Sequence, residues 1–535
     1  MVGPRWAVKT VEKPRSDVIR YEWIANRPKA RESNEKRSKA LPSCGRCVRL
    51  GKSCGGYRDI ADLMFKDESK SVTERLGGTV DSRPRHKQPS PNRETAARQF
   101  FLDNFVTSNH LSSLQETTLD DSLTAPILAC AFVVMANRNA DPQVKEFARY
   151  HYVEAIAATN AALRDTQQAK EDSTLIAVAL LGIYERCNWQ DKTSVDSWTH
   201  HVRGTALVLQ MRGRSQIRTK IGAALFRDMR SDIVVHALAS ENAVPDYIVQ
   251  WTQVMEYDAR YAPIDQLTVL ASRLATLRFS LKAGTMTDTD AFATGEVLEK
   301  DLIGWSENNL AAGTHSSFHN VLAPDSPHSW SGIRHEAGTP NSHRWWNMWR
   351  SLRIMLNRMQ EDLWRRSWPI LVQPTVTIPD ADHFRSIRLR MASDICIAAA
   401  YALGSDNTAE PPQGSVASGY LLINPLGVAG TVLIEQIAEI SESHTGSRQL
   451  LLNRAYHLDA TNPHSKQLAW LLDRVDYIND VIGVKWGRSI SRFLKGELNM
   501  SYCLARSTVI YPPESAHASV PDLANISSSS PLAYQ

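Results

Sequence analysis

Apolar residues recur at helical spacing through most of the chain downstream of about residue 95. Residues 93–106, RETAARQFFLDNFV, are predicted to form the first long helix. Residues 125–139, APILACAFVVMANRN, are so apolar that their helix should be buried on most sides. Residues 146–165 continue the pattern and place five side chains at helical spacing: Phe147, Tyr150, Tyr152, Ile156 and Leu163.

Two further helices are delimited by their end signals. Residues 172–189, DSTLIAVALLGIYERCNW, are predicted to begin with a cap at Asp172 or Ser173 and to continue as a buried helix. In residues 197–215 one helical face carries Trp198, Val202, Ala206 and Leu209, and Gly213 is expected to end the helix. Residues 221–285 are also expected to be helical, and since we find no strand-rich region, we predict an all-α fold.

The second half contains one long aromatic helix and one irregular stretch. Residues 306–343 are rich in Gly, Ser, His, Asn and Pro, which predicts a surface loop or a disordered insertion. Residues 344–366 follow with an apolar stripe and arginines opposite it; a stripe of this kind indicates core more often than a ligand pocket. The stripe consists of Trp345, Trp349, Leu352, Met355, Leu356, Met359 and Leu363. Residues 387–404 are predicted to resume as a helix.

The N-terminal part differs in pattern and in charge. Residues 1–34 lack a sustained apolar period, and residues 76–95 combine Gly77, Gly78, Pro84 and Pro89 with charged residues, as linkers do. Residues 1–95 hold 22 Lys and Arg against 12 Asp and Glu, a net charge of +10, whereas the remainder holds 39 against 45, or −6. A basic arm on a mildly acidic body is typical of proteins that bind polyanions, and a solvated disordered tail is the alternative.

Overall composition narrows the class of protein. A chain of 535 residues with 43% hydrophobic content can bury a sizeable core, and its length suggests one small and one large unit. No stretch resembles a signal peptide, and no eighteen apolar residues run uninterrupted, so we expect neither secretion nor a membrane span. Four of the seven cysteines are scattered, at Cys130, Cys187, Cys396 and Cys503, which indicates a reducing, intracellular compartment.

The other three cysteines lie together in SCGRCVRLGKSCGGY, residues 43–57. Cys44 and Cys47 form a CxxC pair and Cys54 follows six residues later, a spacing that suits metal binding. Basic residues surround these ligands and would place positive charge beside the metal, which suits a phosphate backbone. They are Arg46, Arg49, Lys52 and Arg58.

The order CxxCxxxxxxC followed by GGYRD, with Pro42 ahead of it, resembles the second half of the fungal binuclear zinc-cluster domain of transcription regulators. In that family six cysteines hold two zinc ions. Here residues 1–43 contain no cysteine, which indicates either a real loss of the first half or a wrongly assigned first exon. The basic residues Lys36, Arg37 and Lys39 resemble the DNA-contacting stretch of the family.

Three thiolates cannot complete two zinc sites, because two ions that share ligands need all six sulfurs to reach four-coordination. Two interpretations remain: the cysteines bind no metal tightly, or they hold one zinc ion completed by a ligand such as His86 or by a second chain. Structural zinc supplies roughly 10 to 16 kcal/mol to the folding of small fingers. Without it, we expect residues 1–95 to be poorly ordered.

The body carries a second resemblance. NAAL, LIAVALLGIYE and W..HV.G...VLQ.RG, followed by YLLINPLGVAG (420–430) and LLDRVDYINDVIGVKWGRSISRFL (471–494), are together similar to the fungal-specific transcription factor domain, over roughly residues 95–500. The two resemblances imply a disordered basic N-terminus (1–34), a partial zinc-cluster segment (35–75), a linker (76–95), a helical regulatory domain (96–510) and a disordered tail (511–535).

The resemblance also implies a nuclear regulator of RNA polymerase II promoters that binds DNA, forms a homodimer or pairs with a partner regulator, and does not contact a membrane. Phosphate contacts are expected from Lys36, Arg37, Lys39, Arg46, Arg49 and Lys52. With half of the cluster missing, we expect weak and strongly salt-dependent DNA binding. The alternative is an interaction protein whose helical domain binds a partner regulator or a small-molecule effector.

An enzyme is not indicated. The sequence contains no GxSxG, HExxH, Walker-type or GxGxxG motif. His200 and His201 are adjacent on a predicted helix, so their side chains diverge by about 100° and do not chelate one ion; we expect one packed and one exposed ring. In PDADH, a metal site formed by Asp380, Asp382 and His383 is the alternative to helix capping, which we favour.

Overall fold

The computed structural model describes the chain in segments: residues 90–106, 111, 114, 121–189, 192–255, 261–310, 317–324, 326, 328–337, 340–371, 381–404, 411–445, 461–495 and 497. The chain divides into two units, Met1–Asp59 and Ile60–Gln535, and every described residue belongs to the second.

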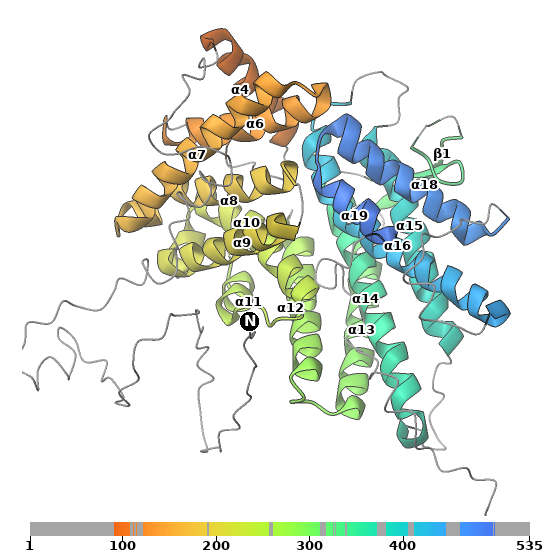
Figure 1. Cartoon of the computed structure of the whole chain (residues 1–535). Helices are drawn as coiled ribbons and strands as arrows, with labels where there is room; N and C mark the ends of the chain where they lie inside the picture. Colours follow the sequence, from red (N-terminus) through yellow and green to blue (C-terminus); the bar gives the residue numbers. More distant parts are fainter. Residues whose placement is uncertain are drawn as a thin grey trace, which may run out of the picture. The chain divides into compact units, whose positions relative to one another are not determined.

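Helices make up most of the described residues, which confirms the predicted all-α fold (Figure 1). The α-helices are α4 (Pro91–Phe105), α6 (Thr124–Asn139), α7 (Pro142–Arg164), α8 (Asp172–Cys187), α9 (Lys192–Arg212), α10 (Lys220–Ser240), α11 (Asp246–Gln253), α12 (Ala262–Lys282), α13 (Asp288–Leu310), α14 (Pro340–Leu371), α15 (Ala381–Leu403), α16 (Ser415–Thr445), α18 (Pro463–Tyr477) and α19 (Trp486–Leu494). Shorter turns are η1 (Asp121–Leu123), η2 (Gln168–Lys170), η3 (Arg214–Arg218) and the π-helical η5 (Ile478–Ile482).

Local chemistry explains several helix ends and corrects one prediction. The Asp141 side chain caps α7 by accepting hydrogen bonds from two backbone N–H groups at 2.8 and 3.2 Å. Gly213 ends α9 as predicted, with a φ of 76° that favours glycine. The predicted cap of α8 is wrong: Glu171 occupies the N-cap without a side-chain bond, while Asp172 lies in the first turn and pairs with Arg212 of α9.

Most helices pack against neighbours that are close in the sequence. α6 packs against α7, α8 against α9, and α10 against both α9 and α12. α12, α13 and α14 lie side by side, and α14, α15, α16 and α18 continue the series (Figure 1). The C-terminal segment then returns to the first helices, since η5 contacts α6 and α16 contacts α4. Residues more than 300 positions apart therefore meet, as when the Gly414 N–H donates to the Asp103 carbonyl at 2.8 Å.

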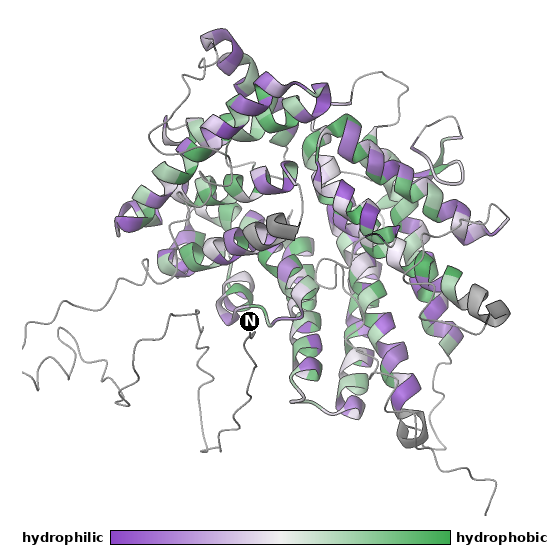
Figure 2. Cartoon of the chain, viewed as in Figure 1, coloured by the Kyte–Doolittle hydropathy of each residue, from purple (hydrophilic) through white to green (hydrophobic). Residues whose placement is uncertain are grey.

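One continuous apolar core joins these helices, and Figure 2 shows hydrophobic residues on the faces where they meet. Helix α6 is buried on most sides, as predicted, from Ile127 to Val134. Within α16 the stretch Ser415–Ala438 is long and apolar enough to cross a membrane, and it is the one helix of the described residues with that property. Its most apolar window is 78% buried inside the protein, as expected for a core helix.

Helix α14 is buried on two faces. The predicted apolar stripe packs in the core, with Trp349 and Leu363 buried. Three arginines of α14, Arg350, Arg353 and Arg358, are buried as well, and neighbouring helices supply carboxylates for two of them. Arg353 pairs with Glu299 of α13, and Arg358 lies 2.9 Å from Glu435 of α16. These pairs fix α14 between its neighbours, since an unpaired buried charge costs several kcal/mol.

For residues 306–343, the prediction of a surface loop or a disordered insertion is wrong where the structure describes them. Residues 306–310 finish α13, and α14 begins at Pro340. Between them β1 (Phe318–Leu322) pairs antiparallel with β2 (Ile333–Ala337), with Phe318 opposite Ala337. β2 packs against α14 and α15, and His335 is buried there. Turn-forming residues between the strands gave this hairpin its loop-like composition.

Candidate functional site

The residues predicted to bind zinc and DNA all lie outside the described residues. The predicted zinc ligands are Cys44, Cys47 and Cys54, and the predicted phosphate contacts are Lys36, Arg37, Lys39, Arg46, Arg49 and Lys52. Residues 1–95 were predicted to be poorly ordered. Of these, residues 1–89 lie outside the described residues, whereas Pro91–Thr95 form the start of α4.

The three cysteines among the described residues have a structural role. Cys130, Cys187 and Cys396 are free and buried, and burial raises the pKa of Cys187 and of Cys396 to about 12. Such thiols stay protonated and are poor metal ligands. Over the described ranges, no group of three or more His, Cys, Asp or Glu side chains is placed to hold a metal ion.

Two groups of residues were considered as metal ligands in the sequence: the pair His200 and His201, and the PDADH segment at residues 379–383. His200 is exposed and His201 is partly buried, as expected for neighbours on one helix. Burial, and secondarily the charge of His200, lowers the pKa of His201 to about 4, so its ring is neutral at physiological pH. In the PDADH sequence Asp380 lies outside the described residues, and Asp382 pairs with Arg385 one turn along α15 at 2.6 Å.

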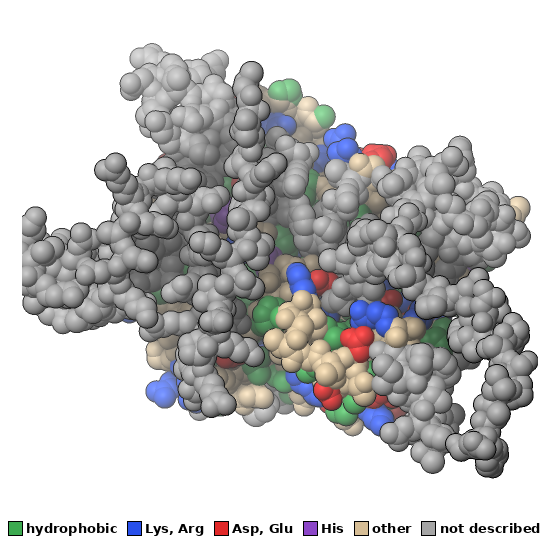
Figure 3. Space-filling view, turned by 60° about the horizontal axis from the view of Figure 1, so that its bottom comes forward, with side chains coloured by type: hydrophobic (Ala, Val, Ile, Leu, Met, Phe, Trp, Pro, Cys, Tyr) green, Lys and Arg blue, Asp and Glu red, His purple; other side chains and the backbone are tan. Residues whose placement is uncertain are grey.

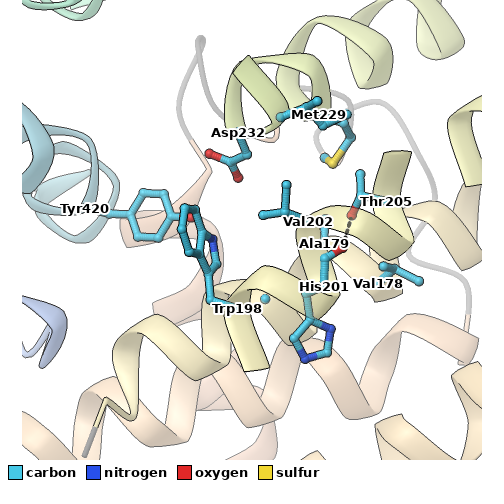
Figure 4. Close-up of a pocket in the computed structure, with 11 residues that line it drawn as sticks. Val178, Ala179, Trp198, His201, Val202, Thr205, Met229, Asp232 and Tyr420 are labelled. Atoms are coloured by element: carbon cyan, nitrogen blue, oxygen red, sulfur yellow. Dashed lines mark hydrogen bonds between the residues drawn. The ribbon is translucent and has the colours of Figure 1, made fainter. Parts of the chain in front are cut away.

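A small cavity lies where α8, α9 and α10 meet α16. Its volume is about 20 Å³, the space of one water-sized group. Figure 4 shows six of the side chains around it, on α9, α10 and α16: Trp198, Val202, Thr205, Met229, Asp232 and Tyr420. The cavity therefore joins helices that are separated by about half of the chain.

Hydrogen-bond acceptors face this cavity. Asp232 provides the one carboxylate among the lining residues, and 35% of its side chain is exposed. The Thr205 hydroxyl donates its proton to the His201 carbonyl at 2.9 Å, so its oxygen can only accept from the cavity. The ring of His201 points away from Asp232 (Figure 4). The lining combines one negative charge with apolar walls.

Directly beside the cavity, Arg186 of α8 is enclosed by three aromatic rings, which we call the Arg186 cluster. Its guanidinium carbon lies 4.5 Å from the ring centroid of Trp198, 4.5 Å from that of Tyr420 and 3.8 Å from that of Trp486. Only 2% of the Arg186 side chain is exposed. Its nearest carboxylate oxygen, on Asp232, is 3.9 Å away, beyond hydrogen-bond distance. Cation–π attraction therefore holds the charge in place of a close ion pair.

The sequence did not identify Arg186 as a functional residue. It follows directly on LIAVALLGIYE, and its three ring partners come from the other segments that carry the resemblance: Trp198 from W..HV.G, Tyr420 from YLLINPLGVAG and Trp486 from VKWGRS. These segments lie far apart in the sequence, and the Arg186 cluster is the point at which they meet. The sequence signal that could have pointed to Arg186 was the fixed order of these motifs, which the fold brings together around one buried charge.

Comparison with known families identifies part of the chain. Residues 85–330 match the model of the fungal specific transcription factor domain. That family is a transcription factor domain, a class that is typically non-enzymatic. No curated protein and no solved structure matches the chain. The match includes Arg186, Trp198 and Asp232, whereas Tyr420 and Trp486 lie beyond its end.

Proposed function

We propose that this protein is a nuclear regulator of transcription in fungi that acts at RNA polymerase II promoters. The observation that carries the proposal is the match of residues 85–330 to the fungal specific transcription factor domain. Two features support it: the all-α body, the first part of which the match covers, and the cysteine segment that precedes it.

DNA binding is assigned to the N-terminal segment. Its net charge of +10 contrasts with −6 for the rest of the chain. On the face drawn in Figure 3, basic and acidic side chains of the described residues are interspersed, without a large patch of one sign. Phosphate contacts by Lys36, Arg37, Lys39, Arg46, Arg49 and Lys52 position the segment but do not select a sequence.

Zinc binding by Cys44, Cys47 and Cys54 is incomplete in this proposal. Three thiolates hold at most one ion, which needs a fourth ligand such as His86 or a residue of a second chain. The segment then folds only in part, so that affinity for DNA is weak and falls steeply with salt. A homodimer or a pair with another regulator would supply the missing contacts.

The second candidate function is that of an interaction protein that does not touch DNA. Its support is the absence of cysteine from residues 1–43, together with the cavity beside the Arg186 cluster. In this case the helical body binds a partner regulator or a small-molecule effector, and regulation passes through that contact.

Zinc content and DNA affinity of the full-length protein separate the two functions. We expect about one zinc per chain in the natural protein and none when Cys44, Cys47 and Cys54 are all changed to Ser. A basic-residue variant, Lys36, Arg37 and Lys39→Gln, should weaken DNA binding and lower the slope of log affinity against log salt by about 3. The matched control changes Arg5, Lys9 and Arg15 to Gln, with the same loss of charge.

The two variants decide between specific placement and bulk charge. Equal weakening by both would show that only net charge matters and would remove the role assigned to residues 36–39. No zinc and no affinity for DNA, together with recovery of an intact zinc-cluster protein in a pull-down, would favour the interaction protein.

A further inference from the structure

The cavity beside the Arg186 cluster has the chemistry of a binding site for a cation that donates hydrogen bonds. Its polar lining atoms include the Asp232 carboxylate and the Thr205 oxygen, and the single proton of Thr205 is already donated to the His201 carbonyl at 2.9 Å. The Met229 sulfur, a weak acceptor, points into the same space (Figure 4). A water molecule has two protons for such acceptors, whereas an ammonium group has three.

Asp232 is the one charged side chain among the residues that line the cavity. Asp232 is not closely paired, because its nearest basic atom, Nη1 of Arg186, lies 3.9 Å away. Arg186 does not line the cavity. Its guanidinium stacks on the rings of Trp198 and Tyr420, which do line it, and those rings accept a cation on their faces. The carboxylate thus retains free acceptor positions toward the cavity.

We propose that this cavity binds the ammonium group of a small primary amine with an apolar tail. The volume of about 20 Å³ holds one group of the size of water or ammonium, so the head group fills it. The tail extends out of the cavity on the side of the partly exposed Asp232. A carboxylate ligand is disfavoured because it would face Asp232.

A ligand in the cavity would affect the contacts of the C-terminal helices α16 and α19. A bound ammonium group competes with Arg186 for Asp232, and Arg186 is held by Tyr420 of α16 and Trp486 of α19. The same helices are tied to α8 by the backbone, since the Lys485 N–H donates to the Cys187 carbonyl at 3.3 Å. The regulatory meaning of this contact rests on the proposed function, whereas amine binding is measured independently of it.

Calorimetric titration of the full-length protein at constant ionic strength tests the site. n-Butylammonium chloride should bind with one site per chain, and Asp232→Asn should weaken its binding at least tenfold. Thr205→Val, which removes the second oxygen acceptor, should weaken it severalfold. The matched control is Asp301→Asn on α13, where 42% of the carboxylate side chain is exposed and which does not line this cavity; n-butylammonium binding should be unchanged in it. Thermal unfolding without ligand confirms that each variant is folded.

Four further probes define the chemistry. n-Butanol lacks the charge, butyrate reverses it, tetramethylammonium has no N–H and is too large, and ammonium chloride has no tail. Each should bind at least tenfold more weakly than n-butylammonium. The proposal is overturned if n-butylammonium does not bind, if Asp232→Asn leaves its affinity unchanged, or if butanol or butyrate binds equally well. Equal binding of ammonium chloride would show a site for a free inorganic cation instead. None of these outcomes bears on zinc or DNA.

Discussion

The guanidinium of Arg186 lies over the ring of Trp486, 3.8 Å from its centroid, and joins two residues that are 300 positions apart. Trp486 is also near Trp198 and Trp189, with ring centroids 6.0 and 6.2 Å away. A single buried cation on α8, within the matched residues, therefore contacts both α9 and the last described helix, α19. The last described helix is held to α8 by this contact and by the backbone bond from the Lys485 N–H to the Cys187 carbonyl.

Two replacements of Arg186 distinguish the contribution of its charge to stability from the contribution of its side-chain volume. Arg186→Ala removes three cation–π contacts and leaves a cavity, so we expect a loss of about 3 kcal/mol in the free energy of unfolding. Arg186→Met keeps most of the volume and buries no charge, so its loss should stay below about 1.5 kcal/mol. Arg149→Ala, in a partly exposed pair with Glu146, is the control, with about 0.5 kcal/mol. Urea unfolding measures all three. Equal losses for Ala and Met would refute a volume-dominated contribution.

A second prediction concerns the buried pair between Arg230 and Asp265. Arg230 of α10 is fully buried, and it also donates to Thr252 at 2.9 Å. Asp265→Asn leaves this cation without its carboxylate, which should cost about 3 to 5 kcal/mol. Asp301→Asn breaks an exposed pair with Arg273 and should cost at most about 1 kcal/mol. The urea midpoint at unchanged slope measures the difference, and similar midpoints for the two variants would contradict it.

Acid should destabilise the protein through two histidines of the hairpin and one at the start of α14. Burial, then the nearby charge of Arg350, lowers the pKa of His335 and of His343 to about 3, and burial, then Arg474, lowers that of His328 to about 4. The folded state thus binds fewer protons than the unfolded state. Their stabilising contribution is complete above about pH 6.5 and is lost progressively as the pH falls below it.

The size of this loss follows from the unfolded-state pKa. At pH 5 each of these histidines should remove up to about 2 kcal/mol. His335→Gln should lower the slope of unfolding free energy against pH between 7 and 5, because the unfolded state then takes up one proton fewer in this range. His319→Gln is the control, since 72% of the His319 side chain is exposed on the same hairpin. An unchanged slope in His335→Gln would exclude that histidine as a source of the effect.

The helices were predictable because their signals are local. Trp198, Val202 and Leu209 repeat at helical spacing, and Gly213 supplies the φ that ends α9. The wrong cap at Asp172 has a tertiary cause, because Arg212 on the next helix takes its carboxylate. Local patterns specify where a helix forms but not which long-range partner takes a polar side chain.

Burial of charge and the candidate site depend on distant residues. Arg353 is buried because Glu299, 54 positions earlier, pairs with it. The hairpin holds His335 in the core beside Arg350, at 3.0 Å, although its composition is that of a loop. The Arg186 cluster takes its members from four helices, so no single segment predicts it.

A glycine pair tests how closely η5 approaches α6. Gly483 has a φ of 90°, and a Cβ there would lie 3.0 Å from the Val134 carbonyl oxygen; Gly284 has a φ of 66° with no atom within 4 Å of such a Cβ. Gly284→Ala should cost about 1 kcal/mol, from backbone strain alone, whereas Gly483→Ala adds a contact that cannot relax and should cost about 2 to 4 kcal/mol. Thermal unfolding compares them. If both variants lost the same stability, the approach of the C-terminal segment to α6 would not be tight.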